Sequence, residues 1–423
     1  MRISRYNVSF KINENENIIF NTRSRKYVLF RNNEELGAIN ETIDALIQQN
    51  YDNTELLKNV GILIADNENE LEEIKFREHT TMYQDQCFKL TIQPTLDCNF
   101  RCSYCYEKHI DMRMEDQTIE NILKFIDKIT RKVNKLIINW FGGEPLLEAD
   151  SIIILCENIN KICKNNNCSY ESALITNGYL LNNDLIKKID LLNLRKIQIT
   201  IDGIDEIHDL TRMYMDGTGT FEKIYKNLIE ALNTGIYITL RINVSNKNYN
   251  CITQLFDMIP EEKRSKVIIS LANIFQEKDK ISLFELNKLA IEKGYAIGNV
   301  FHNTFICEGA IKNSLLINPE GKISSCAMAA EKGIMFGKID NEGNIKFDNK
   351  TEFFKIRNII ASNEVGCSEC VKLPLCYGGC KLNRYLNKGI CNWNNPTGMT
   401  LEERIKLRYL QDTLANRKVV DII

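Results

Sequence analysis

The chain lacks several features that would place it in a broad class at once. It has no run of eighteen or more apolar residues, so we expect no membrane span. Its N-terminal stretch, MRISRYNVSFKINENENIIF, has no uninterrupted apolar core after the basic start and does not read as a signal peptide. With a mean hydropathy of -0.27, these absences predict a soluble, cytoplasmic protein that has no membrane partner.

An excess of charge is also missing. The 54 basic and 56 acidic residues leave a net charge of -2, and no long Lys/Arg run is present. Nucleic-acid binding normally needs a basic patch, so we expect no nucleic-acid partner.

Cysteine, in contrast, is abundant. Disulfides are uncommon in the cytosol, so fifteen cysteines in a chain without an export signal favour metal binding or redox chemistry. Ten of them fall into patterns. The others are scattered and are interpreted as ordinary thiols: Cys87, Cys156, Cys163, Cys168 and Cys251.

A length of 423 residues predicts two or three domains. Residues 1–80 have the pattern of a small α+β module. Strands are expected at 7–13, 18–23 and 26–31, with helices at 34–49 and 53–60 and a helical linker at 67–86.

Six strand-like runs then alternate with helical segments, at 88–94, 135–141, 172–176, 196–202, 237–244 and 266–273. Such alternation is typical of parallel strands joined by helices. Six units are too few for a closed eight-stranded barrel, so we expect an α/β fold in which residues 81–300 form a partial (β/α)6 TIM barrel. Chemistry in such folds lies at the carboxyl ends of the strands.

Beyond residue 300 the pattern changes to short strands, turns and cysteines. Little apolar periodicity remains there, so metal clusters are expected to stabilise residues 301–400. Residues 401–423 are expected to form a C-terminal helix.

Cys98, Cys102 and Cys105 form the first cysteine pattern, CNFRCSYC. Zinc is the alternative for such a loop, but the spacing lacks paired Cys-x2-Cys knuckles and only His109 is near enough to be a fourth ligand. A 4Fe-4S cluster fits better, because three thiolates can hold it with one iron left open.

This loop resembles the cluster loop of the radical S-adenosylmethionine (SAM) superfamily, including an aromatic residue, Tyr104, before the third cysteine. The resemblance implies that SAM itself chelates the open iron. An electron from the cluster would cleave SAM to a 5'-deoxyadenosyl radical that abstracts hydrogen.

Three further segments are similar to SAM-binding elements of that superfamily. WFGGEPLL would meet the SAM amino group, LITNGYLL its ribose or methionine part, and an arginine after ITIDG its carboxylate. Taken alone, each has a simpler interpretation: a tight turn for the first two, and a solvated surface side chain for the arginine. His208 and Asp209 are expected to organise their loop. The implied SAM contacts are Tyr104, Gly142, Gly143, Glu144, Thr176, Asn177 and Arg212.

The remaining seven cysteines, with Gly321, resemble the SPASM extension of radical SAM enzymes that mature peptides and proteins. The resemblance implies two auxiliary 4Fe-4S clusters. Zinc is again the alternative, because Cys-x2-Cys pairs commonly hold it. The implied ligands are Cys307, Cys326 and Cys380 for the first cluster, and Cys367, Cys370, Cys376 and Cys391 for the second.

The first auxiliary cluster is therefore one ligand short. Either His302 completes it, or its open iron accepts a substrate thiolate.

Two departures separate the chain from sulfatase-maturing enzymes that share this tail. Ala327 follows Cys326 where those enzymes have an aspartate, and about eighty residues precede the barrel. The N-terminal module resembles instead the winged-helix-like (RRE-like) domains that recognise leader peptides, where an extended leader would add to an exposed strand edge. A stabilising cap on the barrel is the alternative.

The resemblance thus implies a maturase of ribosomally made peptides (RiPP) of the ranthipeptide or sactipeptide type. Its partners would be a precursor peptide with a leader and an electron donor such as flavodoxin or ferredoxin. We expect an intramolecular Cys thioether as product. The alternatives are a carbon-carbon or carbon-oxygen crosslink, a protein oxidase of the sulfatase-maturing type, and a noncatalytic iron-sulfur or zinc scaffold.

Overall fold

The structure is a computed structural model. It describes residues 1–30, 38–49, 51–298, 300–301, 306–387, 391, 393, 397–415 and 421–422. No helix among these residues is long and apolar enough to cross a membrane.

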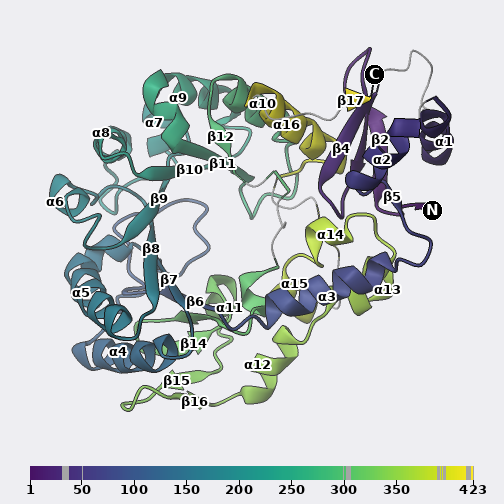
Figure 1. Ribbon diagram of the computed structural model, residues 1–423. Coiled ribbons are helices and arrows are strands. Elements are labelled where there is room, and N and C mark those ends of the chain that lie inside the picture. Colours follow the sequence, from purple (N-terminus) through teal and green to yellow (C-terminus); the bar gives the residue numbers. More distant parts are fainter. Residues whose placement is uncertain are drawn as a thin grey trace.

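A curved sheet of eleven strands forms the centre of the molecule (Figure 1). Its order is β12-β11-β10-β9-β8-β7-β6-β13-β14-β15-β16, and the strands from β12 to β13 are all parallel. The first strands are β6 (Cys87–Ile92), β7 (Lys135–Trp140), β8 (Ser169–Thr176), β9 (Leu194–Thr200), β10 (Tyr237–Val244) and β11 (Val267–Asn273). These are the six predicted strands, which confirms the partial barrel.

The sheet extends further than predicted at both ends. β12 (Ala296–Ile297) adds to β11, while β13 (Ser314–Ile317) pairs in parallel with β6 and leads to β14 (Lys322–Ser324), β15 (Gly337–Ile339) and β16 (Ile345–Phe347). The C-terminal region therefore grows directly out of the barrel sheet.

Burial alternates along the barrel strands, as the two-residue period of a strand requires. One set of side chains is apolar and fully buried against the helices outside the sheet; the Phe88 and Phe125 rings, for example, lie 5.9 Å apart. The outer helices are α4 (Asp116–Thr130), α5 (Ala149–Asn165), α6 (Asn183–Ile186), α7 (Asp205–Asp209), α8 (Phe221–Asn233), α9 (Ile252–Met258) and α10 (Phe284–Glu292), with short 3-10 turns η1 (Pro145–Glu148), η2 (Tyr249–Cys251) and η3 (Glu261–Lys266). The other set faces inward and includes polar residues.

The N-terminal module has its own sheet and core. The predicted strands form as β2 (Asn7–Lys11), β3 (Asn17–Asn21) and β4 (Lys26–Phe30), while β1 (Arg2–Ile3) pairs with β5 (Leu63–Ile64). The predicted helices form as α1 (Ile39–Gln49) and α2 (Tyr51–Asn59). Residues 34–37 of the first predicted helix lie outside the described residues.

The C-terminal prediction needs a correction. The helix α16 ends early (Leu401–Leu414), and β17 (Asp421–Ile422) is a strand that pairs in parallel with β4. One edge of the N-terminal sheet is thus covered by the chain itself at Leu29 and Phe30, and β2 is the strand at the opposite end.

The predicted linker forms the helix α3 (Glu70–Met82), which is embedded in the C-terminal region. The carboxylate of Glu78 lies 3.0 Å from the Lys381 ammonium, and both side chains are fully buried. Glu78 also accepts hydrogen bonds from the backbone N–H groups of Ala361 and Ser362. Burial opposes ionisation, yet Lys381 and these hydrogen bonds hold the pKa of Glu78 below its usual range.

The expectation that the C-terminal region lacks apolar packing was wrong. Leu315, Ile323 and Phe336 belong to the main core, while Ala361, Leu373 and Tyr377 form a separate core with Tyr6, Ile74 and Met82. The region's remaining elements are η4 (Glu308–Ala310), α11 (Ala327–Glu331), α12 (Lys350–Arg357), η5 (Ala361–Asn363), α13 (Val365–Ser368), α14 (Leu373–Cys376) and α15 (Lys381–Leu386). The periodicity was missed because these elements are too short to show it.

Candidate functional site

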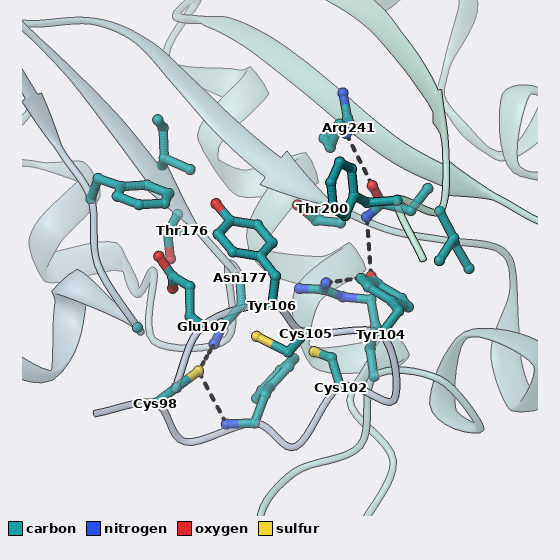
Figure 2. Close-up of a pocket in the computed structure, with 18 of the residues that line it drawn as sticks. Cys98, Cys102, Tyr104, Cys105, Tyr106, Glu107, Thr176, Asn177, Thr200 and Arg241 are labelled. Carbon is teal, nitrogen blue, oxygen red and sulfur yellow. Dashed lines mark hydrogen bonds between the residues drawn. The ribbon is translucent and has the colours of Figure 1, made fainter. Parts of the chain in front are cut away.

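A cavity of about 450 Å³ lies at the carboxyl ends of the barrel strands. The loop that carries Cys98, Cys102 and Cys105 forms one wall, and inward-facing residues of β8 to β11 form another (Figure 2). Met328, on α11, contributes from the C-terminal region. The cavity occupies the position where a partial barrel is expected to carry its chemistry.

The three cysteines of the loop all line this cavity, and Figure 2 shows their sulfur atoms along the same side of it. Burial raises the pKa of all three thiols, that of Cys98 to about 12. Thiolates are the metal-binding form, so a metal at this loop would have to promote their deprotonation. Across the described residues, no group of three or more His, Cys, Asp and Glu side chains surrounds a single-ion position.

Tyr104 ties the cysteine loop to the ends of two strands. Its hydroxyl donates to the Asp202 carboxylate and accepts hydrogen bonds from Arg212 Nη1 at 2.8 Å and Asn243 Nδ2 at 3.1 Å. The backbone N–H of Asn243 in turn donates to Asp202 Oδ1 at 2.7 Å. This buried network fixes the loop between its second and third cysteines.

Arg212 is buried beneath this network and is not a solvated surface residue. Its guanidinium lies 5.7 Å from the centre of the Phe100 ring, and its Nε is buried without a hydrogen-bond partner. Burial alone would lower the pKa of Arg212, but Cys102, Tyr104 and Asp202 raise it well above its ordinary value. The cavity wall therefore carries a permanent positive charge.

His208 and Asp209 organise the Arg212 loop, as predicted. His208 Nδ1 accepts a hydrogen bond from the backbone N–H of Asp202, and Asp209 Oδ1 accepts one from the backbone N–H of Thr220. Both side chains thereby hold the chain on either side of Arg212.

Gly142 and Gly143 line the cavity, and the structure shows why a side chain is excluded there. A Cβ on Gly142 would lie 2.4 Å from the Thr95 carbonyl oxygen, and one on Gly143 would lie 2.1 Å from that of Asp97. The two glycines thus allow the turn after β7 to pack against the start of the cysteine loop.

Glu144 has a different position from the one predicted. It is fully buried, does not line the cavity, and accepts hydrogen bonds from Thr176 Oγ1 at 2.7 Å and from the backbone N–H groups of Asn177 at 2.7 Å and Leu146 at 3.0 Å. Burial raises the pKa of Glu144, and these hydrogen bonds oppose the rise. Its carboxylate therefore positions the end of β8.

Thr176 and Asn177 both line the cavity, where Asn177 Nδ2 donates to Asn99 Oδ1 at 2.8 Å. These two residues connect the cysteine loop to β8.

Sequence reasoning missed Glu107, which follows the cysteine loop directly. Its side chain lines the cavity, and its Oε1 is buried without a partner. Burial raises the pKa of Glu107 to about 8, and the nearby Glu331 carboxylate adds to the rise. Glu107 and Arg212 both line the cavity, and each keeps one buried polar atom, a carboxyl oxygen and a guanidinium nitrogen, without a hydrogen-bond partner.

Asp202, Arg241 and Asn243 were also missed. They lie at or near the ends of β9 and β10, so polar residues at the carboxyl ends of predicted strands were a usable signal. Nothing in the sequence pattern indicated that Met328 would reach the cavity.

The C-terminal region contains a second cavity, of about 270 Å³, which we call the four-cysteine site. It brings together the residues assigned to the second auxiliary cluster, Cys367, Cys370, Cys376 and Cys391. Arg384 also lines it, and its Nη2 donates to Cys367 Sγ at 2.9 Å.

The three residues assigned to the first auxiliary cluster also lie close together, and we call them the three-cysteine site. Cys307 and Cys380 share a side-chain hydrogen bond that raises the pKa of Cys307 and lowers that of Cys380, and Cys326 interacts electrostatically with both. His302, the possible further ligand, lies outside the described residues.

Residues 92–259 match the family model of the Radical SAM superfamily. An uncharacterized protein of Methanocaldococcus jannaschii is 33% identical over 38% of this chain and 54% of its own length. Fe-coproporphyrin III synthase of Methanosarcina barkeri is 26% identical over 41% of each chain, and GTP 3',8-cyclase of Clostridium perfringens is 31% identical over 36% of this chain and 45% of its own. The chain thus spans about half the length of these curated relatives.

Among solved structures, native anSMEcpe with bound AdoMet and Cp18Cys peptide aligns with a TM-score of 0.58 and 20% identity, over 78% of this chain and 99% of that one. Streptococcus suis SuiB bound to the precursor peptide SuiA aligns with a TM-score of 0.53 and 16% identity, over 92% of this chain and 97% of that one. These likenesses establish a shared fold.

Proposed function

We propose that this chain is a radical SAM maturase and that it crosslinks a ribosomally made precursor peptide. The observation that carries the proposal is the barrel cavity, which joins the cysteine loop to Glu107 and Arg212, each with one polar atom that has no hydrogen-bond partner. Cys98, Cys102 and Cys105 would hold a 4Fe-4S cluster there, and Arg212 and Glu107 would pair with the charged amino acid end of SAM.

When bound, the cluster and SAM would supply a 5'-deoxyadenosyl radical that abstracts a hydrogen from the peptide. The protein's own residues orient the reactants. Tyr104 and Asp202 fix the loop, and the inward-facing Gln198 and Thr200 line the cavity. Arg212, which donates to Tyr104, would hold the SAM carboxylate by charge-assisted hydrogen bonds. An electron donor such as a flavodoxin or ferredoxin would supply the electron.

Two auxiliary 4Fe-4S clusters complete the proposed set of three. The four-cysteine site has a full set of thiols around one cavity, while the three-cysteine site has one fewer. Cys307, Cys326 and Cys380 would hold a cluster with one iron that lacks a protein ligand. When bound, such a cluster would supply a position for a substrate thiolate and an acceptor for the electron released on thioether formation. For this reason we favour a Cys thioether over a carbon-carbon or carbon-oxygen crosslink.

A precursor peptide is the proposed substrate because the fold matches SuiB, whose structure was solved with the precursor peptide SuiA, and anSMEcpe, solved with the Cp18Cys peptide. The N-terminal module would recognise the leader. Since β17 already covers the edge of β4 at Leu29 and Phe30, we propose that the leader adds to β2 (Asn7–Lys11) by main-chain hydrogen bonds.

The test is an anaerobic reaction of the enzyme, SAM and reductant with a peptide encoded beside the gene, followed by mass spectrometry. We expect the loss of two hydrogens for each crosslink, with one peptide thiol consumed. Loss of hydrogens with every thiol still alkylatable would exclude the thioether and favour a carbon-carbon or carbon-oxygen crosslink.

A protein oxidase and a noncatalytic scaffold would give different results in the same reaction. An oxidase of the sulfatase-maturing type would produce an aldehyde; Ala327, which lacks an ionisable group, disfavours it. A scaffold would release no deoxyadenosine from SAM.

A further inference from the structure

Arg357 is a buried arginine with unused hydrogen-bond donors. It is the last residue of α12, and only 3% of its surface is exposed. Its Nη2 donates to the Ser314 carbonyl at 2.7 Å, but its Nε and Nη1 are buried with no hydrogen-bond partner. Buried donors are rarely left unpaired, because desolvating them without a partner is costly.

Packing fixes the orientation of this guanidinium. Its carbon lies 3.9 Å from the centre of the Phe353 ring and 5.7 Å from that of Phe336. Its position at the C-terminal end of a helix also favours a positive charge. Burial lowers the pKa of Arg357 to about 10, so the group still carries its proton at neutral pH.

Arg357 lies on an element that packs beside the three-cysteine site. Its helix, α12, contacts η4 (Glu308–Ala310), which begins directly after Cys307. The thiols of Cys326 and Cys307 act electrostatically on the guanidinium. A neutral thiol is a weak acceptor for the two unpaired nitrogens, whereas thiolates and the sulfur atoms of a cluster are acceptors that carry negative charge.

Two other buried arginines, unlike Arg357, have hydrogen-bond acceptors close to their donor nitrogens. Arg404 donates to the Met399 and Val300 carbonyls and to Thr397 Oγ1. Arg384 donates to Cys367 Sγ in the four-cysteine site. Arg357 resembles Arg384 in its location beside cysteines but differs in having donors still to be paired.

We propose that Arg357 is a positioning residue of the three-cysteine site, where its two unpaired nitrogens, Nε and Nη1, donate to the sulfur ligands of the bound cluster and its charge raises the cluster's reduction potential. Reduction adds a negative charge, which a nearby cation and N–H···S hydrogen bonds stabilise. The inference rests on the proposed first auxiliary cluster and assigns it a residue that lies outside the cysteine pattern.

The test is an anaerobic redox titration followed by electron paramagnetic resonance, in a full-length Cys98→Ala/Cys102→Ala/Cys105→Ala protein so that only the auxiliary clusters contribute. Arg357→Gln should shift the potential of the first auxiliary cluster to a more negative value. Arg357→Lys, which keeps the charge but loses the planar fork of donors, should give a smaller shift in the same direction. The second auxiliary cluster should not move in either variant.

Arg384→Lys is the matched control and should shift only the second cluster. The proposal is overturned if both Arg357 variants keep their iron and their potentials equal that of the parent protein. If Cys326→Ser removes no iron from the parent, the proposed cluster itself is wrong, which is a separate failure from that of Arg357.

A measurement without an Arg357 substitution covers the case in which both variants fail to fold, as thermal melting would show. Protein labelled with ¹⁵N-arginine should give a nitrogen hyperfine coupling to the reduced first cluster, and this coupling should persist in Arg384→Lys. Absence of that coupling would contradict the proposal.

Discussion

The three-cysteine and four-cysteine sites are built from the same residue types but differ in completeness. The four-cysteine site surrounds one cavity, and its arginine already donates to a sulfur atom. The three-cysteine site has one cysteine fewer, and Arg357, on the helix that contacts η4 beside it, has two unpaired nitrogens. We infer that the four-cysteine site is closed and has a structural or electron-relay role. The three-cysteine site would keep a position open for substrate.

The largest expected effect is on SAM cleavage, and it concerns the cysteine loop of the barrel. Replacing Cys98, Cys102 and Cys105 together with Ala should abolish cleavage of SAM, because no other described cysteines line the barrel cavity. Chromatography of deoxyadenosine measures this, and iron analysis should show that the auxiliary clusters remain. Residual SAM cleavage would mean that the three-cysteine or four-cysteine site can cleave SAM without the barrel loop.

Replacing one cysteine ligand should affect the four-cysteine and three-cysteine sites differently. Cys391→Ser and Cys326→Ser should each lower the iron content by about four atoms per chain if each site holds its own 4Fe-4S cluster. Of the two, we expect only Cys326→Ser to abolish thioether formation completely, since Cys326 belongs to the site proposed to bind the substrate thiolate. Iron analysis and peptide mass spectrometry are the measurements. Equal loss of product in both variants would remove the distinction between the sites.

A buried ion pair anchors the three-cysteine site, since Lys381 directly follows Cys380. Lys381→Met should destabilise the protein by about 3–5 kcal/mol, because it leaves the Glu78 carboxylate buried without its cation. Chemical denaturation of the full-length protein measures the effect.

Two variants control for this prediction. Lys75→Met, which breaks the exposed pair with Glu72, should cost less than about 1 kcal/mol. The double variant Glu78→Leu/Lys381→Met should recover much of the loss. A single-variant cost no larger than that of Lys75→Met would show that the pair is unimportant.

The smallest effect concerns the contact of the N-terminal module with the four-cysteine site. Thr22 Oγ1 donates to the Val371 carbonyl at 2.6 Å, between Cys370 and Cys376. Thr22→Val should cost about 1 kcal/mol and leave the iron content unchanged, because one hydrogen bond is lost while the shape is kept. Thr22→Ser retains the hydroxyl and serves as the control. Loss of iron in Thr22→Val would show that the module supports the site more strongly than we expect.

The same contacts change how the N-terminal module must be studied. Deleting residues 1–80 would remove Glu78, Tyr6 and Ile74, which pack against the C-terminal region. Such a deletion would damage the auxiliary sites together with any leader recognition. Single substitutions on β2 at exposed positions, such as Lys11, avoid this problem.

Much of the fold followed from short patterns in the sequence. The six barrel strands and the three N-terminal strands were predicted because period-two alternation and buried apolar runs are local signals. The parallel pairing of β13 with β6 and of β17 with β4 was missed, because pairing between distant segments leaves no mark in a single sequence.

The candidate site was predicted in part for the same reason. Cysteine spacing predicted which cysteines the fold brings together, but it could not show that Glu144 turns inward to hold β8 or that Arg357 is buried with unpaired donors. Those roles depend on where a side chain points in the folded chain, and for an isolated Glu or Arg the sequence carries no such information.

The most direct test of the central claim is to follow hydrogen from the peptide to SAM. A precursor peptide deuterated at the carbon that becomes crosslinked should, under anaerobic turnover, yield 5'-deoxyadenosine that contains deuterium, together with the crosslinked peptide. Formation of the crosslinked peptide with no deuterium in the deoxyadenosine, or release of deoxyadenosine with the peptide unchanged, would contradict a radical peptide maturase.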